Sequence, residues 1–221
     1  MCKRNNRYYE EPYSQSGFNV TEAWPGELTF FSWQDFVTAI PSPLFLITTY
    51  KSNGKENACL QSWSTFVGDS GEFICIIGSV SKDGHLYQSL KETKCCVLNF
   101  PSYDICDKCV QTIKNNGFDD DEITLSGLTA EKAKTVNAPR IAECFLSIEC
   151  EFLWEREHFE GSPNVTVALR ATHICMDSDH YDQNKLGRYG KTGYMYNVHS
   201  PRNPETGEVT PDCFGALELY R

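Results

Sequence analysis

The stretch that decides the fold runs from Asn57 to Phe100. It contains NACLQSWSTFVGD (57–69), followed by FICIIGSVSKDGHLYQSLKETKCCVLNF (73–100). Two apolar segments flank a polar run that carries hydroxyls, a lysine and a histidine. We expect a strand whose backbone can bind the edge of a flat ring, and a strand-to-helix turn whose N–H groups can bind an anion. The rest of the chain is expected to build a barrel around these segments.

The composition is that of an ordinary globular protein and limits its partners. The 221 residues suit one domain with long edges or one domain with a small appendage. The net charge of −10 argues against nucleic acid or an anionic membrane as the main partner, because both would repel the average surface. No apolar run approaches the roughly 18 residues that a membrane span needs.

The cysteines and the first residues bear on the cellular compartment. The sequence opens MCKRNNRYYEEPYSQ, which lacks the apolar core of a secretory signal peptide. The 11 cysteines, an odd number, are scattered through expected strands, where reduced thiols behave as small hydrophobes. We therefore expect a cytoplasmic protein.

Three regions differ in residue pattern. Residues 1–30 are polar and aromatic and are expected to form an N-terminal arm. Residues 31–180 are expected to form the barrel, beginning with a short capped helix over 32–40. Residues 181–221 are loop-rich and are interpreted as a C-terminal extension that packs on the barrel or on a partner subunit.

Strand patterns dominate the barrel region, with shorter helical patterns between them. The expected strands cover 44–50, 57–65, 73–77, 95–100, 144–153 and 165–175. The expected helices cover 81–93, 104–116 and 128–136. Asn53-Gly54 predicts a tight hairpin, and the acidic run 119–122 is expected to be a solvated loop. The chain is therefore predicted to be mainly β, as a closed or partly closed Greek-key barrel with inserted short helices.

The segment 57–65 is the candidate for binding a flat ring. Alternation along a strand places Leu60, Ser62 and Ser64 on one face and Gln61, Trp63 and Thr65 on the other. An edge or bulged strand of small polar residues could supply backbone groups to the edge of the ring, and Trp63 could supply an apolar wall. An ordinary half-buried strand with a core tryptophan is the alternative.

The segment SVSKDGH (79–85) is the candidate for binding an anion. It follows an apolar strand and precedes a helix, where N–H groups and the helix dipole favour a phosphate. Ser79 and Ser81 add hydroxyls and Lys82 adds a positive charge. A simple capped turn is the alternative, since the chain has neither a Walker loop nor a G-x-G-x-x-G fingerprint.

Cys106 and Cys109 form a C-x-x-C pattern on an expected helix. A redox pair usually opens a helix, where the dipole lowers the thiol pKa. A zinc site would need two further ligands, and no matching pair is evident, so no metal is predicted. Packing of both thiols in a core is the alternative. Of the histidines, His85 is the candidate for a catalytic role because it lies beside the anion-binding segment.

The order of several short motifs resembles one known family. An N-x-x-x-x-S-W-S strand is followed by an apolar strand, a polar turn and a helix ending K-E-T, then by V-L-N-F-P and N-A-P-R-I-A-E-C. This order, from Pro41 to Phe152 with a weaker echo at 186–196, is similar to the flavin reductase-like, flavoredoxin-type family of FMN-binding split barrels. The resemblance implies a split barrel of about six strands and a homodimer with FMN near the subunit interface.

The resemblance also implies the residues that hold the cofactor. Those expected along the ring and ribityl chain are Asn57, Gln61, Ser62, Trp63 and Ser64, with Asn99 approaching from the next strand. Those expected at the phosphate are Ser79, Ser81 and Lys82, while Arg188 and Lys191 could reach it or the partner's site. Leu86 stands where the family often has threonine, and His85 could substitute for it.

The implied function is that of an FMN-dependent oxidoreductase, supplied with electrons by NAD(P)H or a redox protein. The flavin would carry the reaction, so no side-chain acid or base is strictly needed. A flavin-binding carrier or sensor without turnover is the alternative, and a thiol protein using Cys106 and Cys109 is a third possibility.

Overall fold

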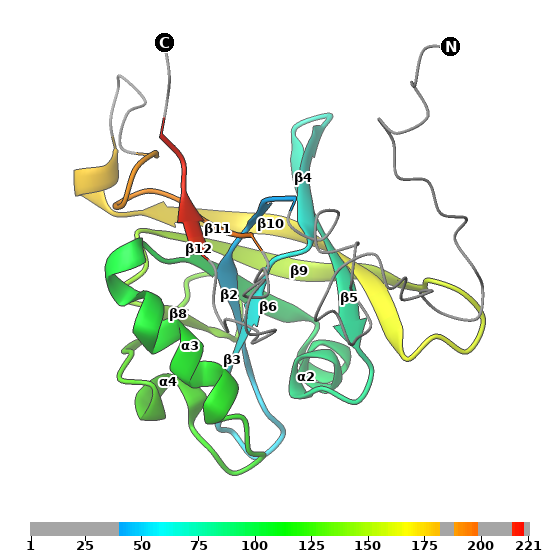
Figure 1. Ribbon diagram of the computed structural model, residues 1–221. Helices are drawn as coiled ribbons and strands as arrows, with labels where there is room; N and C mark the ends of the chain where they lie inside the picture. Colours follow the sequence, from blue (N-terminus) through cyan, green and yellow to red (C-terminus); the bar gives the residue numbers. More distant parts are fainter. Residues whose placement is uncertain (1–39, 182–187, 199–213, 219–221) are drawn as a thin grey trace, which may run out of the picture. The chain divides into compact units, whose positions relative to one another are not determined.

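One antiparallel sheet of seven strands forms the body of the protein (Figure 1). The computed structural model describes residues 40–181, 188–198 and 214–218. In spatial order the strands are β3 (Glu56–Gln61), β2 (Phe45–Tyr50), β6 (Cys95–Phe100), β9 (Leu146–Glu157), β10 (Asn164–Met176), β5 (Glu72–Ser81) and β4 (Ser64–Asp69).

The sheet curls so that strands near its two ends share one core. The rings of Phe45 on β2 and Phe66 on β4 lie 6.0 Å apart, although four strands separate β2 from β4 in the sheet order. Phe66 also packs 5.9 Å from Phe100 on β6. The edges themselves, β3 and β4, do not pair, so the barrel is split. The predicted fold class is confirmed, with seven strands in place of about six.

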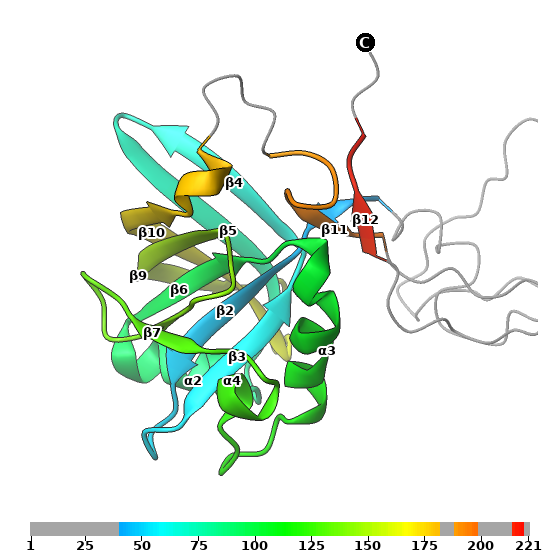
Figure 2. The same ribbon diagram turned by 90° about the vertical axis from the view of Figure 1, so that its left-hand side faces the viewer.

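Helices cover the two faces of the β2–β3 end of the sheet. Helix α2 (His85–Thr93) inserts Leu86 and Leu90 into the main core beside Ile47. On the opposite face, α3 (Cys106–Lys114) and α4 (Glu122–Leu125) pack against Leu46 in a second cluster. Figures 1 and 2 both show α2 on one side of β2 and β3, and α3 with α4 on the other.

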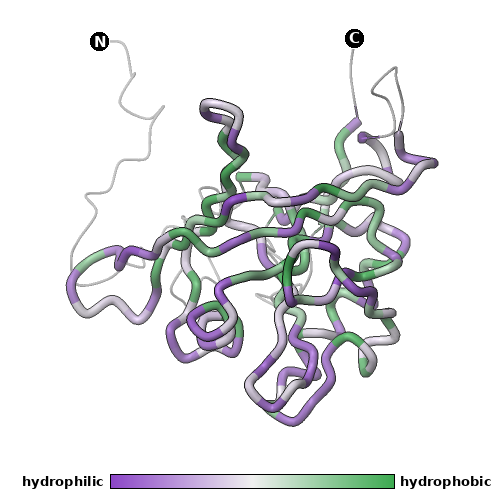
Figure 3. The backbone as a smooth tube through the Cα atoms, turned by 180° about the vertical axis from the view of Figure 1, so that it is seen from behind, coloured by the Kyte–Doolittle hydropathy of each residue, from purple (hydrophilic) through white to green (hydrophobic). Residues whose placement is uncertain are grey.

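Two local predictions are confirmed by the pairing of the strands. The hairpin between β2 and β3 turns at Asn53-Gly54, where Gly54 has φ +80°, a conformation that glycine adopts without steric cost. The expected partners β9 and β10 pair over most of their length, and apolar residues alternate along both. Figure 3 shows this alternation as changing hydropathy along the tube.

The predicted strand 57–65 is wrong as a single element. The chain leaves one sheet edge after Gln61, where β3 ends, and enters the opposite edge at Ser64, where β4 begins. Strand alternation therefore cannot be carried across Ser62 and Trp63. Both views show the β4–β5 hairpin extending away from the β2–β3 hairpin (Figures 1 and 2).

The predicted boundary between strand and helix also differs. Strand β5 continues to Ser81, which pairs with Asn164, and α2 begins only at His85. The long β10 pairs with Val80 and Ser81 beyond a bulge, and these ladder hydrogen bonds outweigh a weak helical pattern. Ser79 and Ser81 therefore belong to the strand and not to the turn.

Two predictions fail in the segment after α3. The helix expected over 128–136 is replaced by a short hairpin of β7 (Ala130–Lys132) and β8 (Pro139–Ile141). In the acidic run, Glu122 is only 1% exposed rather than solvated. The helix expected over 104–116 is confirmed as α3, preceded by a 3-10 turn at Tyr103–Ile105. The helix expected over 32–40 and the arm 1–30 lie outside the described residues.

A second, three-stranded sheet joins the start of the barrel to the C-terminal part of the chain. Its strands are β1 (Ser42–Pro43), β11 (Met195–Asn197) and β12 (Phe214–Ala216). The N–H of Leu44 donates to the carbonyl of Met195 at 2.8 Å, and Met195 is buried beside Cys106. Residues 195–197 are therefore held next to the beginning of β2.

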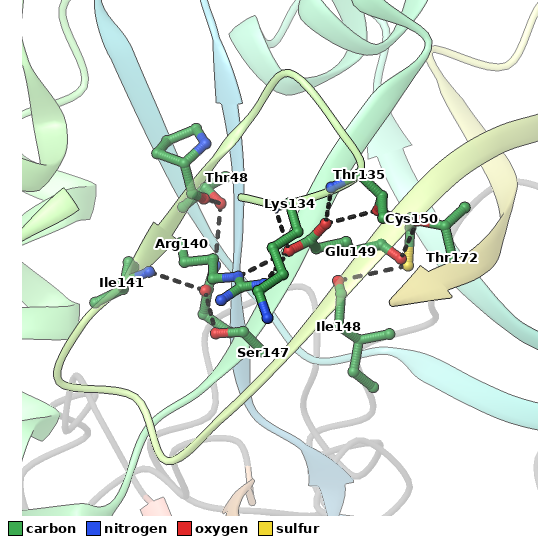
Figure 4. A network of polar contacts seen from close by, with 12 residues as sticks. Thr48, Lys134, Thr135, Arg140, Ile141, Ser147, Ile148, Glu149, Cys150 and Thr172 are labelled. Atoms are coloured by element: carbon green, nitrogen blue, oxygen red, sulfur yellow. Dashed lines mark hydrogen bonds and ion pairs between the residues drawn. The ribbon is translucent and has the colours of Figure 1, made fainter. Parts of the chain in front are cut away.

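A buried carboxylate anchors the β7–β8 hairpin to the outer face of the sheet (Figure 4). Glu149 on β9 is 0% exposed and accepts from the backbone N–H of Lys134 at 2.9 Å, from Thr135 and from Arg140 Nε at 2.8 Å. Burial alone would raise its pKa, but the bonds from Lys134, Thr135 and Arg140 outweigh it and bring the pKa to about 2. The β7–β8 hairpin is thus fastened by an ion pair whose carboxylate also accepts backbone hydrogen bonds.

We predict that Glu149→Gln destabilises the protein by about 3 kcal/mol, because it leaves the buried Arg140 without a counter-charge. The pKa of Glu149 is lower in the folded state than its ordinary value. Its contribution to the free energy of unfolding is therefore present above about pH 4.5 and is lost as the pH falls through about 2. Urea unfolding at pH 7 measures the change. Glu151→Gln is the control, since Glu151 pairs with Arg170 on the exposed surface. Equal losses in the two variants would contradict the anchoring role.

Candidate functional site

The break between β3 and β4 gathers residues from three parts of the chain. Ser62 lies in the break, and its hydroxyl accepts a hydrogen bond from Asn197 Nδ2 at 3.2 Å. The N–H of Gly78 on β5 donates to the carbonyl of Trp63 at 2.7 Å. A Cβ at position 78 would lie 3.4 Å from that carbonyl, at the limit of ordinary contact.

Two features of this junction are typical of a ligand-binding site. The hydroxyl of Ser64 is buried and has no hydrogen-bond partner, which is costly unless something else satisfies it. Ser79, on the β5 bulge opposite β10, holds φ +59°, an uncommon conformation for a residue other than glycine. Trp63 is 42% exposed beside them.

Asn57 and Gln61 lie on the same face of the edge strand β3, toward the main core. Asn57 is buried and donates to Thr49 Oγ at 3.3 Å, and Gln61 Nε2 contacts Cys59 Sγ at 3.5 Å. The structure thus brings Gln61 to the start of the break, whereas Asn57 lies further back along β3 near the end of β2.

The expected anion-binding turn lies at the end of β5, between Ser81 and His85. The N–H of Gly84 donates to the carbonyl of Ser81 at 3.2 Å, which closes the turn. The ammonium group of Lys82 is paired with the carboxylate of Glu157 on β9. The hydrogen bond from Lys82 is the main cause that lowers the pKa of Glu157.

His85, the first residue of α2, adjoins a buried ion pair that sequence reasoning missed. Its Nδ1 lies 3.8 Å from Glu122 Oε1, and the same oxygen is 2.7 Å from Lys51 Nζ. Glu122 Oε2 also accepts from the N–H of Ala58 on β3 at 2.8 Å. Nothing in the local pattern of Lys51 or of the acidic run signals this pairing, because it depends on contacts distant in sequence.

The expected residues at positions 99, 188 and 191 lie elsewhere. Asn99 is on the opposite face of the sheet from Asn57, and its amide bonds Thr48, Ser147 and the N–H of Ile141. It therefore joins β2, β6, β8 and β9 in a buried structural network, part of which Figure 4 shows.

Arg188 and Lys191 lie at the end of the barrel opposite to Lys82. The carbonyl of Lys191 accepts from the N–H of Tyr103, just beyond the end of β6 that pairs with the start of β9. Lys82 instead pairs with Glu157 at the far end of β9. Within one chain the structure does not bring these cations together, and a role in a partner's site stays a prediction.

The C-x-x-C pair opens α3 but is deeply packed. Cys106 is the first helical residue, while Cys109 is fully buried, and burial raises the pKa of the Cys109 thiol to about 12. A thiol held protonated in this way is a poor nucleophile. Across the described ranges, no group of three or more His, Cys, Asp and Glu side chains could hold a metal ion.

No helix in the described part of the chain is long and apolar enough to cross a bilayer.

The chain is similar in sequence to a known protein family and to known proteins. The family described as "Flavin reductase like domain" matches residues 37–193. An uncharacterized protein of Methanothermobacter thermautotrophicus is 28% identical over 145 residues, which cover 65% of this chain and 67% of that protein.

Two solved structures share the fold. Flavoredoxin of Desulfovibrio vulgaris (Miyazaki F) has a TM-score of 0.67 at 19% identity and covers 82% of this chain and 90% of its own. An FMN-binding domain of a flavin reductases-like enzyme from Shewanella baltica OS155 has a TM-score of 0.58 at 11% identity, covering 81% and 88%.

The start of β3 generates a prediction about stability and pH. Burial, followed by the neighbouring Asp121 carboxylate, raises the pKa of Glu56 to about 7. Because this pKa lies above its ordinary value of 4.5, the stabilising contribution is fully present below about pH 4.5 and is lost as pH rises through about 7.

We therefore expect the urea concentration at the midpoint of unfolding to decrease in the wild type as the pH rises from 5 to 8. This decrease should be smaller in Glu56→Gln. Glu160→Gln, which changes an exposed carboxylate, is the control and should behave like the wild type. An equal fall in Glu56→Gln would show that this carboxyl does not titrate in that range.

Proposed function

The chain belongs to the flavin reductase-like domain family, and from this we propose that it is an FMN-binding oxidoreductase. Family membership supports a flavin-related oxidoreductase function and a flavin cofactor. The finer proposal is that electrons pass from NAD(P)H or another donor through FMN. The observation that carries it is the junction of Ser62, Trp63 and Ser64 with Gly78 and Ser79 at the split in the barrel.

The residues of the junction fit a flat, heteroatom-rich ring. The unpartnered hydroxyl of Ser64 is a donor or acceptor that a ligand could satisfy. The exposed indole of Trp63 offers an apolar surface beside it. Gln61 closes the end of β3 next to this surface, so these side chains could bind both the edge and the face of a flavin ring.

The turn after β5 fits the phosphate of FMN in its charge and donors. Ser81, Lys82 and His85 lie within five residues at the start of α2. The cation of Lys82 is matched by Glu157 on an exposed surface, where such pairs contribute little and exchange readily. Lys82 could therefore turn from Glu157 to a phosphate at small cost.

A bound flavin supplies reversible acceptance of a hydride or of single electrons. The chain's own residues then bind and orient, and hydrogen bonds from Ser64 and Gln61 tune the ring. No nucleophile or general base is needed from the protein. The high pKa of Cys109 also argues against a thiol relay through Cys106 and Cys109.

We propose further that the protein is a cytoplasmic homodimer. The nine cysteines of the described residues are free thiols, which supports a reducing compartment. The exposed apolar side chains of Trp154 and Val67 on the outer face of the sheet support burial against a second copy.

The first prediction of this proposal is that purified protein binds FMN more tightly than FAD and oxidises NADH or NADPH. The visible spectrum and stopped-flow absorbance measure the two parts. A colourless protein that binds no added flavin would overturn the proposal. A yellow protein that never oxidises either nucleotide, with or without free flavin, would instead indicate a carrier or sensor.

The second prediction uses the exposed ion pair. Lys82→Met should weaken FMN binding about tenfold and leave riboflavin binding unchanged, because only FMN carries the phosphate. Glu157→Gln is the matched variant and should tighten FMN binding, since it releases Lys82. Calorimetric titrations with both ligands measure the effects. Equal weakening of the two ligands in Lys82→Met would remove the lysine from the phosphate site.

A further inference from the structure

We infer that Glu122 is a positioning residue that directs the imidazole of His85 toward the phosphate of the flavin ligand. The inference rests on the proposed function and adds a specificity determinant to it. Glu122 belongs to a run of acidic residues whose sequence pattern indicates only a solvated loop, and its place in the structure is different.

The carboxylate of Glu122 is held by one contact at each of its two oxygens. Lys51 Nζ lies 2.7 Å from Oε1, and the N–H of Ala58 lies 2.8 Å from Oε2. Lys51 itself is anchored by the carbonyls of Gly117 at 2.7 Å and Asp120 at 2.9 Å. The side chains of Lys51 and Glu122 are 2% and 1% exposed, so neither can leave without exposing an unpaired charge.

The imidazole of His85 is the member of this cluster whose Nδ1 makes no hydrogen bond. Its Nδ1 is buried, has no hydrogen-bond partner and faces Glu122 Oε1 across 3.8 Å. That distance is too long for a hydrogen bond, and a small rotation of the ring would close it. The side chain is 22% exposed, and because Nδ1 is buried, the accessible part of the ring lies away from Glu122.

This geometry gives His85 a defined role when it is protonated. Nδ1–H donates to Glu122, and Nε2–H is left to donate to an anion on the other side of the ring. The charge of Lys82 is already matched by Glu157, and that of Lys51 by Glu122. An imidazolium at His85 therefore adds a second cation beside Lys82 at the turn, which suits a phosphate monoester.

The charged groups around His85 must be separated in any test that varies pH. Glu122 and Lys51 face it from α4 and from the end of β2, while the ring of Phe118 packs edge-on at 6.0 Å. Asp83 precedes it by two residues in the turn. Glu56 lies beside Asp121, next to Glu122, and burial together with the Asp121 carboxylate raises its pKa to about 7.

The experiment measures the dissociation constants of FMN and riboflavin in wild type, His85→Asn, Glu122→Gln and the double variant. The ratio of riboflavin to FMN constants isolates the phosphate contribution and cancels any general loss of folded protein. We expect His85→Asn to lower this ratio about tenfold and Glu122→Gln to lower it several-fold. The double variant should equal His85→Asn, because Glu122 acts through the imidazole.

The dependence on pH provides a readout that a purely structural role would not change. The ratio should depend on pH differently in the wild type and in His85→Asn, because the phosphate's own ionisation is common to both and cancels in the comparison. Glu56→Gln is the control and should keep the wild-type profile. Glu122→Asp keeps the counter-charge of Lys51 but draws back from His85, so it replaces Glu122→Gln if that variant does not fold.

The outcomes distinguish this inference from the proposed function. A protein that binds neither ligand would overturn the function. Binding of both ligands with a ratio unchanged in His85→Asn would overturn only the role of His85. A Glu122→Gln variant that weakens both ligands equally would show that Glu122 supports the fold and does not position the imidazole.

Discussion

The structure depends on one topological constraint: consecutive strands β3 and β4 occupy opposite edges of the same sheet. The chain can make that step across Ser62 and Trp63 only because the sheet curls and brings its ends together, as the contact between Phe45 and Phe66 shows. The junction therefore cannot be regular, although the carbonyl of Trp63 still accepts from the N–H of Gly78. The irregular junction is for this reason the candidate site, and its Ser64 hydroxyl is left without a partner.

Two buried carboxylates fasten peripheral elements to the sheet. Glu149 fastens the β7–β8 hairpin to the outer face of the sheet, and Glu122 joins the edge strand β3 to Lys51 and the start of α4. Both sit on the side of the sheet away from the main core. Each carboxylate contacts a backbone N–H as well as a cation, which lowers the cost of burying the charge.

Much of the barrel could be predicted from the sequence, because local patterns specify it. The Asn53-Gly54 hairpin, the alternation in β9 and β10, and the apolar β6 are all signals within a few residues. The break at Ser62, the continuation of β5 through Ser81 and the burial of Glu122 depend on partners up to many residues away, and no local pattern contains them. The structure brings Ser62, Trp63 and Ser64 together at the junction, as expected. It places Asn99, Arg188 and Lys191 away from them. The order of motifs along a chain does not define which face of a sheet or which end of a barrel a residue occupies.

The buried Glu149 has a further consequence for folding fidelity. The inner face of β9 offers Leu146, Ile148 and Cys150, and such apolar residues could pack in several arrangements with similar energy. A shift of β9 by one residue in its register would turn Glu149 into the apolar core and leave Arg140 without its counter-charge. The carboxylate of Glu149 thus fixes the register of β9 against its neighbours. The core can therefore accept different apolar residues, cysteine among them, and still keep one structure.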